Sequence, residues 1–349
     1  MSRMTGMGRR VRRAALLGGA LLLASVTLAA CGSSSSSGAS AGAGASSNAQ
    51  TNKPGGKTIE FIPTSAIPYF NSEYTGIKAE AKKDGYNTVE QAPSSDADFA
   101  DQVQMVKEAV SNHVAAIVLV PFSPTALVDS VKEAEAAHIP VIATDSTLSP
   151  MVAKSFIAVD DSAAAEAVAR YAAKAVHGHG EYDIVDYNLS TSSGIARRNG
   201  FEKAMKAFPG MKYAGIQISN EVVQTALSET TTQLERNPKI NVIFAADDSS
   251  AVGVAQAVDR LHDQKKVVVV GFDADLGEVN YIKSGTIEAS ALQAPVRMGQ
   301  AAVQSLHKIF GGGSVPKTQT LAYHLVTTKN LGAASSVAAV KQYVPGYGK

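Results

Sequence analysis

The sequence predicts an α/β protein with two domains, each built on a doubly wound parallel sheet. Short, continuous apolar runs recur along the chain, as expected for strands that are buried on both faces. Amphipathic helical patterns separate these runs, which is the alternation that parallel sheets require. The runs also form two successive blocks that meet near residue 160, so we expect two similar domains.

The first block predicts four strands and two helices. The strands are expected at residues 58–62, 115–120, 140–144 and 155–159. Helical spacing of apolar residues predicts helices at 98–111 and 125–137. The first helix would place Phe99, Val103, Val106 and Val110 on one face, and the second would place Leu127, Val131 and Ala134 likewise.

The second block predicts four more strands, at residues 182–185, 241–246, 266–272 and 286–292. The folded part is expected to begin near Lys57. About 290 residues follow that position, which is enough for two domains.

The N-terminal region predicts export from the cytoplasm. Residues 1–13 carry five arginines and no acid, and residues 14–27 are apolar but short for a spanning helix of about 20 residues. The "LAAC" that ends at Cys31 resembles the lipobox of bacterial lipoproteins. That resemblance implies a signal peptide at 1–30, lipid on Cys31 and, from composition, a flexible Gly/Ser/Ala tether at 31–56. An uncleaved anchor helix is the alternative, and it also places the remainder outside the cytoplasm.

Charge and composition exclude some classes of function. Removal of the five signal arginines leaves 27 basic and 31 acidic residues, so a nucleic-acid partner is not expected. Cys31 is the one cysteine in 349 residues, so disulfides do not hold the fold. Aromatic residues make up 6% of the chain and tryptophan is absent, so aromatics near a candidate site are informative.

Acidic residues follow several predicted strands. In open parallel sheets, ligands bind beyond the carboxyl ends of the strands. Asp145, Asp247 and Asp273 are therefore candidates for a polar ligand site, and the resemblance described below favours ligand contact for all three. The alternative is that each aspartate caps the next helix, and for Asp160 or Asp161 we favour the cap.

Several stretches resemble the periplasmic sugar-binding proteins of ABC importers, of the ribose-binding-protein type. The matching segments include "TIEFIPTSAIPYFNSEYTGIKAEAKKDGYN", "ARRNGFEKAM", "NVIFAADDSSAVGVAQAV", "VVVVGFDAD" and "ASALQAPVRMGQAAV". Together with the βαβαβ run between them, they cover roughly residues 57–330 in order.

The resemblance implies the type I periplasmic-binding-protein fold, in which two lobes joined by three crossovers hold a ligand between them. The crossovers would lie near Val159–Asp160, Gln293–Ala294 and Tyr323–Leu325. The N-terminal lobe would comprise 57–159 and 294–323, and the C-terminal lobe 160–293 and 324–349. Residues 331–349 extend past the matched region, and no role is assigned to them.

The resemblance also implies a set of ligand-binding residues: Tyr69, Phe70, Asp145, Arg197, Asp247, Asp273 and Gln293. Tyr69 and Phe70 would present their rings to a sugar face, with burial under the lobe as the alternative. Carboxylates accept hydrogen bonds from hydroxyls, while the guanidinium of Arg197 donates them in a fixed plane. Arg198 matches less well and is interpreted as a solvated helix residue.

The sequence departs from ribose binders at four positions, namely Ile67, Val120, Ser146 and Glu221. Ribose is therefore in doubt, and a deoxy-sugar, a polyol or a furanose-type quorum signal remains open. The excess of acids over one clear arginine also allows a cationic ligand.

The expected function is a lipid-anchored, extracytoplasmic solute-binding protein that closes around a sugar and delivers it to an ABC permease. We expect a monomer with no cofactor and no metal. A sensor lipoprotein that presents its ligand to a membrane receptor is one alternative.

An enzyme is another alternative, but the seven histidines are scattered, H-E-x-x-H and G-x-S-x-G are absent, and "GGKT" at 55–58 lacks the first glycine of a phosphate loop. We interpret His177 and His179 as a solvated turn instead of a metal pair.

Overall fold

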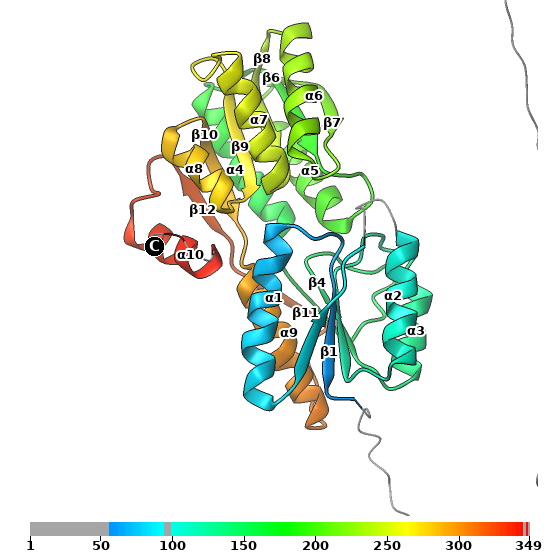
Figure 1. Ribbon diagram of the computed structural model, residues 1–349. Helices are drawn as coiled ribbons and strands as arrows, with labels where there is room; N and C mark the ends of the chain where they lie inside the picture. The colour runs from blue at the N-terminus through cyan, green and yellow to red at the C-terminus, as the bar shows by residue number, and fades with distance from the viewer. Residues whose placement is uncertain (1–55, 94–98, 345–346, 348–349) are drawn as a thin grey trace, which may run out of the picture. The chain divides into compact units, whose positions relative to one another are not determined.

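The computed structural model describes residues 56–93, 99–344 and 347 (Figure 1). The predicted signal peptide at 1–30, Cys31 and the tether up to residue 55 lie outside the described residues. Within the described part of the chain, no helix has the length and apolar character needed to cross a membrane.

The first sheet has six parallel strands in the order β11-β5-β4-β3-β1-β2. These strands are β1 (Thr58–Ile62), β2 (Asn87–Glu90), β3 (Ala116–Leu119), β4 (Val141–Thr144), β5 (Ser155–Val159) and β11 (Thr318–Leu321). Helices α1 (Pro68–Ala81) and α9 (Pro295–Phe310) cover one face, and α2 (Phe99–Ser111) and α3 (Val128–Ala136) cover the other. A 3-10 turn, η1 (Lys82–Asp84), follows α1. We call this unit the N-lobe.

The second sheet has the strand order β12-β10-β9-β8-β6-β7, and β12 alone among these strands runs antiparallel to its neighbour. The strands are β6 (His179–Asp186), β7 (Gly210–Ile218), β8 (Ile240–Ala245), β9 (Val268–Asp273), β10 (Ile287–Leu292) and β12 (His324–Thr327). Helices α4 (Asp161–Ala175) and α5 (Ser192–Met205) cover one face. Helices α6 (Val223–Arg236), α7 (Asp248–Arg260) and α8 (Leu276–Ser284) cover the other, and α10 (Ala334–Tyr343) packs at β10 and β12. We call this unit the C-lobe.

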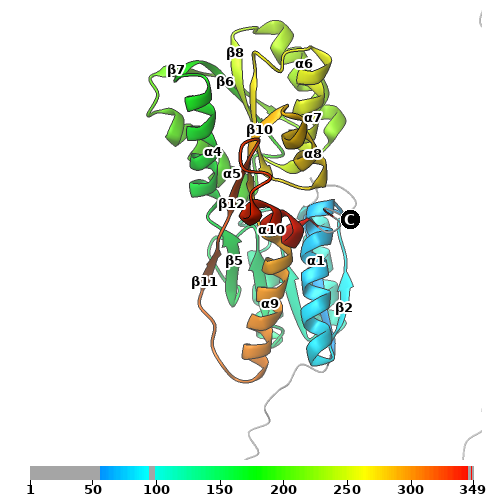
Figure 2. The same ribbon diagram turned by 90° about the vertical axis from the view of Figure 1, so that its left-hand side faces the viewer.

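The described chain passes between the two sheets three times. It leaves the N-lobe after β5, returns between β10 and α9, and leaves again between β11 and β12 (Figure 2). The predicted class, two doubly wound α/β domains joined by three crossovers, is confirmed.

Both faces of each sheet are buried, because four apolar clusters lie between the sheets and their helices. Every residue of β3 and of β4 is buried, as their continuous apolar sequences predict. The predicted inner face of α3 is also confirmed, since Leu127, Val131 and Ala134 are fully buried.

Two glycines set how closely the helices approach near the lobe junction. A Cβ on Gly76 of α1 would lie 2.0 Å from the carbonyl oxygen of Val296 on α9. A Cβ on Gly200 of α5 would lie 2.4 Å from the carbonyl oxygen of Ser162 on α4. The second contact matters for function, because α4 and α5 carry two charged residues that meet in the site described below.

The prediction for the inner face of α2 is partly wrong. Phe99 is 48% exposed, and the fully buried positions are Gln102, Val106 and Ala109. The Gln102 amide donates to the carbonyl oxygens of Pro63 and Val120, both at 2.8 Å. The inner face of α2 thus includes a buried glutamine that bridges two loops, and the spacing of apolar residues alone does not predict a polar side chain there.

The C-terminal segment, to which the sequence assigned no role, completes the C-lobe. Val340 of α10 is fully buried, and Leu331 and Val344 are nearly so, within the cluster that packs under α6, α7 and α8. This segment therefore contributes buried side chains to the core of the C-lobe.

Candidate ligand-binding site between the lobes

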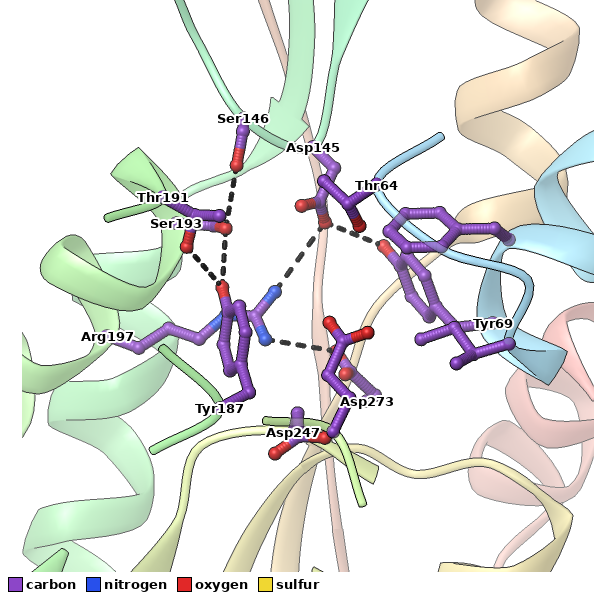
Figure 3. Close-up of a pocket in the computed structure, with 13 residues that line it drawn as sticks. Thr64, Tyr69, Asp145, Ser146, Tyr187, Thr191, Ser193, Arg197, Asp247 and Asp273 are labelled. Carbon is purple, nitrogen blue, oxygen red and sulfur yellow. Dashed lines mark hydrogen bonds and ion pairs between the residues drawn. The ribbon is translucent and has the colours of Figure 1, made fainter. Parts of the chain in front are cut away.

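Side chains from both lobes converge where the strands of the two sheets end (Figure 3). Asp145 follows β4 of the N-lobe, while Asp247 follows β8 and Asp273 ends β9 of the C-lobe. Tyr69 and Phe70 come from the first turn of α1, and Arg197 comes from α5. The cavity is lined by Thr64, Ile67, Tyr69, Phe70, Asp145, Ser146, Tyr187, Thr191, Ser193, Arg197, Glu221, Asp247 and Asp273.

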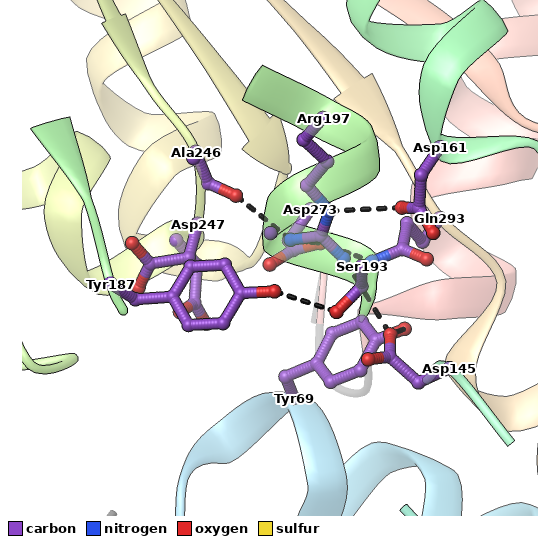
Figure 4. A network of polar contacts seen from close by, with 12 residues as sticks. Tyr69, Asp145, Asp161, Tyr187, Ser193, Arg197, Ala246, Asp247, Asp273 and Gln293 are labelled. Atoms are coloured by element: carbon purple, nitrogen blue, oxygen red, sulfur yellow. Dashed lines mark hydrogen bonds and ion pairs between the residues drawn. The ribbon is translucent and has the colours of Figure 1, made fainter. Parts of the chain in front are cut away.

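Arg197 lies at the centre of this arrangement and is 2% exposed (Figure 4). Its Nε donates to Asp161 at 2.9 Å and its Nη1 donates to the carbonyl oxygen of Ala246 at 2.8 Å. Its guanidinium nitrogens lie 3.6 Å from the carboxylates of Asp145 and Asp273. The guanidinium carbon lies 4.1 Å from the centre of the Phe272 ring. Arg197 thus links acids of both lobes while the C-lobe holds it rigidly.

Asp145 and Asp273 are both held in an uncommon backbone conformation. Their φ angles are +58° and +84°, in the left-handed region that non-glycine residues seldom adopt. Such strained positions concentrate at functional sites. Asp145 accepts a hydrogen bond from the Tyr69 hydroxyl at 3.1 Å, and Asp273 accepts one from the Gln293 amide. Each carboxylate is therefore oriented by a neighbour.

Asp247 lines the cavity and also caps the next helix, whereas the sequence analysis treated ligand contact and capping as alternatives. One of its oxygens caps α7 by accepting from the backbone N–H of Ser250 at 3.3 Å. Its other oxygen, Oδ1, is buried and has no hydrogen-bond partner. Burial raises the pKa of Asp247 to about 7 and that of Asp273 to about 6.

The two lobes touch directly around the cavity, mostly through hydroxyl groups. The contacts are Ser146 Oγ to Ser193 Oγ at 2.8 Å, Thr147 N to Ser192 Oγ at 2.7 Å, and Ser65 Oγ to Glu221 Oε2 at 2.6 Å. They leave a cavity of about 20 Å³, which is room for about one water molecule. A sugar-sized ligand must therefore enter through separation of the lobes.

A second, larger hollow of about 420 Å³ lies on the other side of Tyr69 and Asp273. Pro68, Leu276, Pro295 and Val344 contribute to its walls, so both lobes and the C-terminal segment meet there.

The structure brings six of the seven predicted site residues to the cavity wall, and the seventh lies behind it. Gln293 is fully buried and does not line the cavity, but it donates to Asp273. Three of the four departures from ribose binders, Ile67, Ser146 and Glu221, line the cavity, while Val120 is buried elsewhere in the N-lobe core.

Of the two interpretations of the charged neighbours, the helix cap is confirmed and the one for Arg198 is wrong. Asp160 caps α4, as expected, by accepting from Ala163 N at 2.9 Å, whereas Asp161 is a buried partner of Arg197. Arg198 is not a solvated residue, because it forms an ion pair with the buried Asp186.

Sequence reasoning also missed Tyr187, Thr191 and Ser193, which line the cavity and share hydrogen bonds. Tyr187 directly follows β6, so the rule that ligands lie beyond strand ends applied to it as well. His177 and His179 are exposed and lie at the start of β6, whereas the cavity lies beyond its other end, where Tyr187 follows the strand. Within the described residues, no group of three or more His, Cys, Asp or Glu is placed to hold a metal ion.

The fold and the site define a two-lobed protein that binds a small ligand at the lobe junction. A family profile described as periplasmic binding protein domain matches residues 61–314. This match covers most of the chain, which therefore belongs to the periplasmic binding protein family.

Curated relatives and solved structures agree with this assignment. The D-ribose/D-allose-binding protein of Pseudomonas aeruginosa is 28% identical over 300 residues, covering 83% of this chain and 91% of that protein. The D-apiose import binding protein of Actinobacillus succinogenes is 29% identical over 259 residues, covering 74% and 83%. An ABC transporter solute-binding protein from Agrobacterium vitis, solved with bound D-fucose, matches with a TM-score of 0.78 and 30% identity, covering 82% of this chain and 99% of that one.

Proposed function

We propose that this chain is the extracytoplasmic solute-binding protein of an ABC importer, which captures a sugar between its lobes and delivers it to the permease. The observation that carries the proposal is the position of Arg197 between Asp145 of one lobe and Asp273 of the other. Hydroxyl groups of a sugar can accept from the guanidinium and donate to both carboxylates. The sugars named for similar proteins support this ligand class.

We further propose that residues 1–30 are a signal peptide, that Cys31 carries lipid and that residues 31–56 tether the lobes to the outer face of the cytoplasmic membrane. The sequence pattern around Cys31 supports this part of the proposal. In this arrangement the protein acts by binding and hand-over, and catalysis is not part of its function.

The mechanism is a shift between open and closed arrangements of the lobes. A ligand that contacts Asp145 and Asp273 together favours the closed arrangement by its differential affinity for it. The three chain crossovers form the hinge region, and hydroxyl contacts such as Ser146 to Ser193 separate when the lobes open.

Thermal melting of the purified protein against pentoses, hexoses, deoxy-sugars and polyols tests the sugar proposal. A ligand that binds the folded state raises its stability by about 2.7 kcal/mol at a hundredfold excess over its dissociation constant. Asp273→Asn should abolish this shift. Asp183→Asn should preserve it, because Asp183 is a buried carboxyl outside the cavity wall. If none of these sugars shifted the melting temperature of the native protein, the proposal would be overturned.

A further inference from the structure

The cavity wall carries a marked excess of negative charge. Among the described residues that line it, four are acids and Arg197 is the one cation; the acids are Asp145, Glu221, Asp247 and Asp273. A neutral polyol site needs both donors and acceptors, because each hydroxyl is both. Here acceptors dominate, so the ligand is expected to supply donors and positive charge.

Arg197 does not balance these acids, because other groups of the protein already use much of it. Its Nε is hydrogen-bonded to Asp161, which lies outside the cavity wall. Its Nη1 is hydrogen-bonded to the carbonyl oxygen of Ala246. Counting Asp161 with the wall gives five carboxyl groups around one guanidinium. Carboxyl groups therefore outnumber cations around the cavity among the described residues.

Asp247 shows most directly what the cavity lacks. It is 3% exposed, and its Oδ1 has no hydrogen-bond partner although its Oδ2 caps α7. Thr64 Oγ1, on the N-lobe side of the wall, is also buried without a partner. A buried polar atom without a partner costs about 1–3 kcal/mol, so Asp247 Oδ1 marks a position where a ligand donor is strongly favoured.

We propose that the ligand is an amino sugar, and that Asp247 with Asp273 and Glu221 holds its protonated amine. This inference rests on the proposed function and specifies its ligand class. An ammonium group offers three donors and one positive charge, whereas the hydroxyl that it replaces offers one donor and no charge. Hydrogen bonds to charged groups contribute about 1.5–3 kcal/mol, so the amine should improve affinity about tenfold to hundredfold over the matched hydroxyl.

The pH dependence of binding separates this mode from the binding of a neutral sugar. The charged groups that face Asp247 are Asp273, Arg197 and the adjacent Asp248, with Glu221 on the same wall. Burial raises the pKa of Asp247 to about 7, so its protonated form is abundant at mildly acidic pH. An ammonium requires the ionised form of Asp247 and loses affinity as pH falls from 7 to 6. A neutral hydroxyl that accepts from the protonated form shows the opposite trend. Above pH 7 the amine of the free sugar begins to lose its proton, as α-amino groups do at about 7.7–8.0, so binding of the ammonium is expected to be strongest near neutral pH.

The experiment compares matched pairs by titration calorimetry: D-glucosamine with D-glucose, D-galactosamine with D-galactose, and D-mannosamine with D-mannose, each at pH 6, 7 and 8. The expected result is tighter binding of at least one amino sugar than of its partner, with a preference that is greater at pH 7 than at pH 6. Asp247→Asn should remove the preference and keep the fold, because asparagine also caps helices. Asp183→Asn, which changes a buried carboxyl outside the wall, should leave it intact.

The possible outcomes distinguish this inference from the proposed function. Equal or tighter binding of the neutral sugars would overturn the amino-sugar inference and leave the sugar-binding function standing. Tight binding of spermidine, with no binding of any amino sugar, would support a site for a cationic ligand but overturn the claim that this ligand is a sugar. Binding of none of these ligands or of other sugars would overturn both.

Discussion

The Asp161 carboxylate accepts a hydrogen bond from Nε of Arg197 at 2.9 Å, so the first residue of α4 fixes the cation of the site from behind. Both side chains are almost completely buried. Their approach depends on Gly200, which lets α5 lie against the carbonyl oxygen of Ser162. Helix packing in the C-lobe therefore determines where the guanidinium stands.

Asp161→Ala should destabilise the protein by about 3–5 kcal/mol, because it leaves a buried guanidinium without its closest carboxylate. It should also weaken ligand binding, since Arg197 is no longer held. Urea unfolding and titration calorimetry measure the two effects. The neighbouring change Asp160→Ala removes a helix cap and should cost about 1 kcal/mol with affinity unchanged. Equal effects of the two changes would contradict this role for Asp161.

Gly200→Ala should destabilise the C-lobe by about 1–3 kcal/mol, because the added methyl group would force α5 away from α4. Ligand affinity should fall as well, since Arg197 moves with α5. Gly311→Ala is the matched control, because the nearest atoms would lie 3.5 Å from the new Cβ and the site is remote. Chemical unfolding that gives the same midpoint for both variants would argue against the close packing.

Stability should fall as pH rises from about 4 to 8. Burial raises the pKa of Glu73 to about 8 and that of Asp183 to about 7, far above the values in the unfolded chain. The folded state therefore binds more protons than the unfolded state within this window, and its stability declines as these groups ionise. Each kcal/mol lost lowers the melting temperature by about 2–4 °C in domains of 150–250 residues.

Melting curves recorded without added sugar at pH 5, 6, 7 and 8 check this prediction. Asp183→Asn removes one of the titrating groups, so its melting temperature should depend less steeply on pH. A melting temperature that increases between pH 5 and 8 would show that the buried carboxyls are ionised in the folded state.

Val340→Ala should lower the free energy of unfolding by about 1.5 kcal/mol or more, because two buried methyl groups are lost from the C-lobe core. This change tests whether α10 belongs to the cooperative fold. Ala338→Ser, on the exposed side of the same helix, should have little effect. Indistinguishable unfolding curves for the two variants would mean that α10 is only loosely attached.

Buried strands were the part of the fold that the sequence predicted best. β1 and β5 begin and end at the predicted residues, because a strand covered on both faces is mostly apolar and stands out in the sequence. The strands β2, β7, β11 and β12 were missed. All four are sheet edges with mixed exposure, as in "NTVE" and "TQTL", and their positions depend on pairing partners elsewhere in the sequence.

The site could be predicted in part because parallel strands deliver their last residues to one edge. That rule located Asp145, Asp247 and Asp273, and the resemblance added Arg197. It could not show that Asp161 faces Arg197 while Asp160 caps the helix, because adjacent residues at a helix start point in different directions. It also could not distinguish Gln293, which orients Asp273, from residues that line the cavity.

The hydroxyl contacts between the lobes have a kinetic consequence. Three hydrogen bonds between the lobes surround a cavity that is too small for a sugar, namely Ser146 to Ser193, Thr147 to Ser192 and Ser65 to Glu221. All three must be replaced by hydrogen bonds to water before a ligand reaches Arg197. The association rate constant is then scaled by the fraction of time that the lobes spend apart. At low sugar concentration, uptake would accordingly depend on the population of the open state. Variants that weaken these three contacts would bind sugar faster and also release it faster.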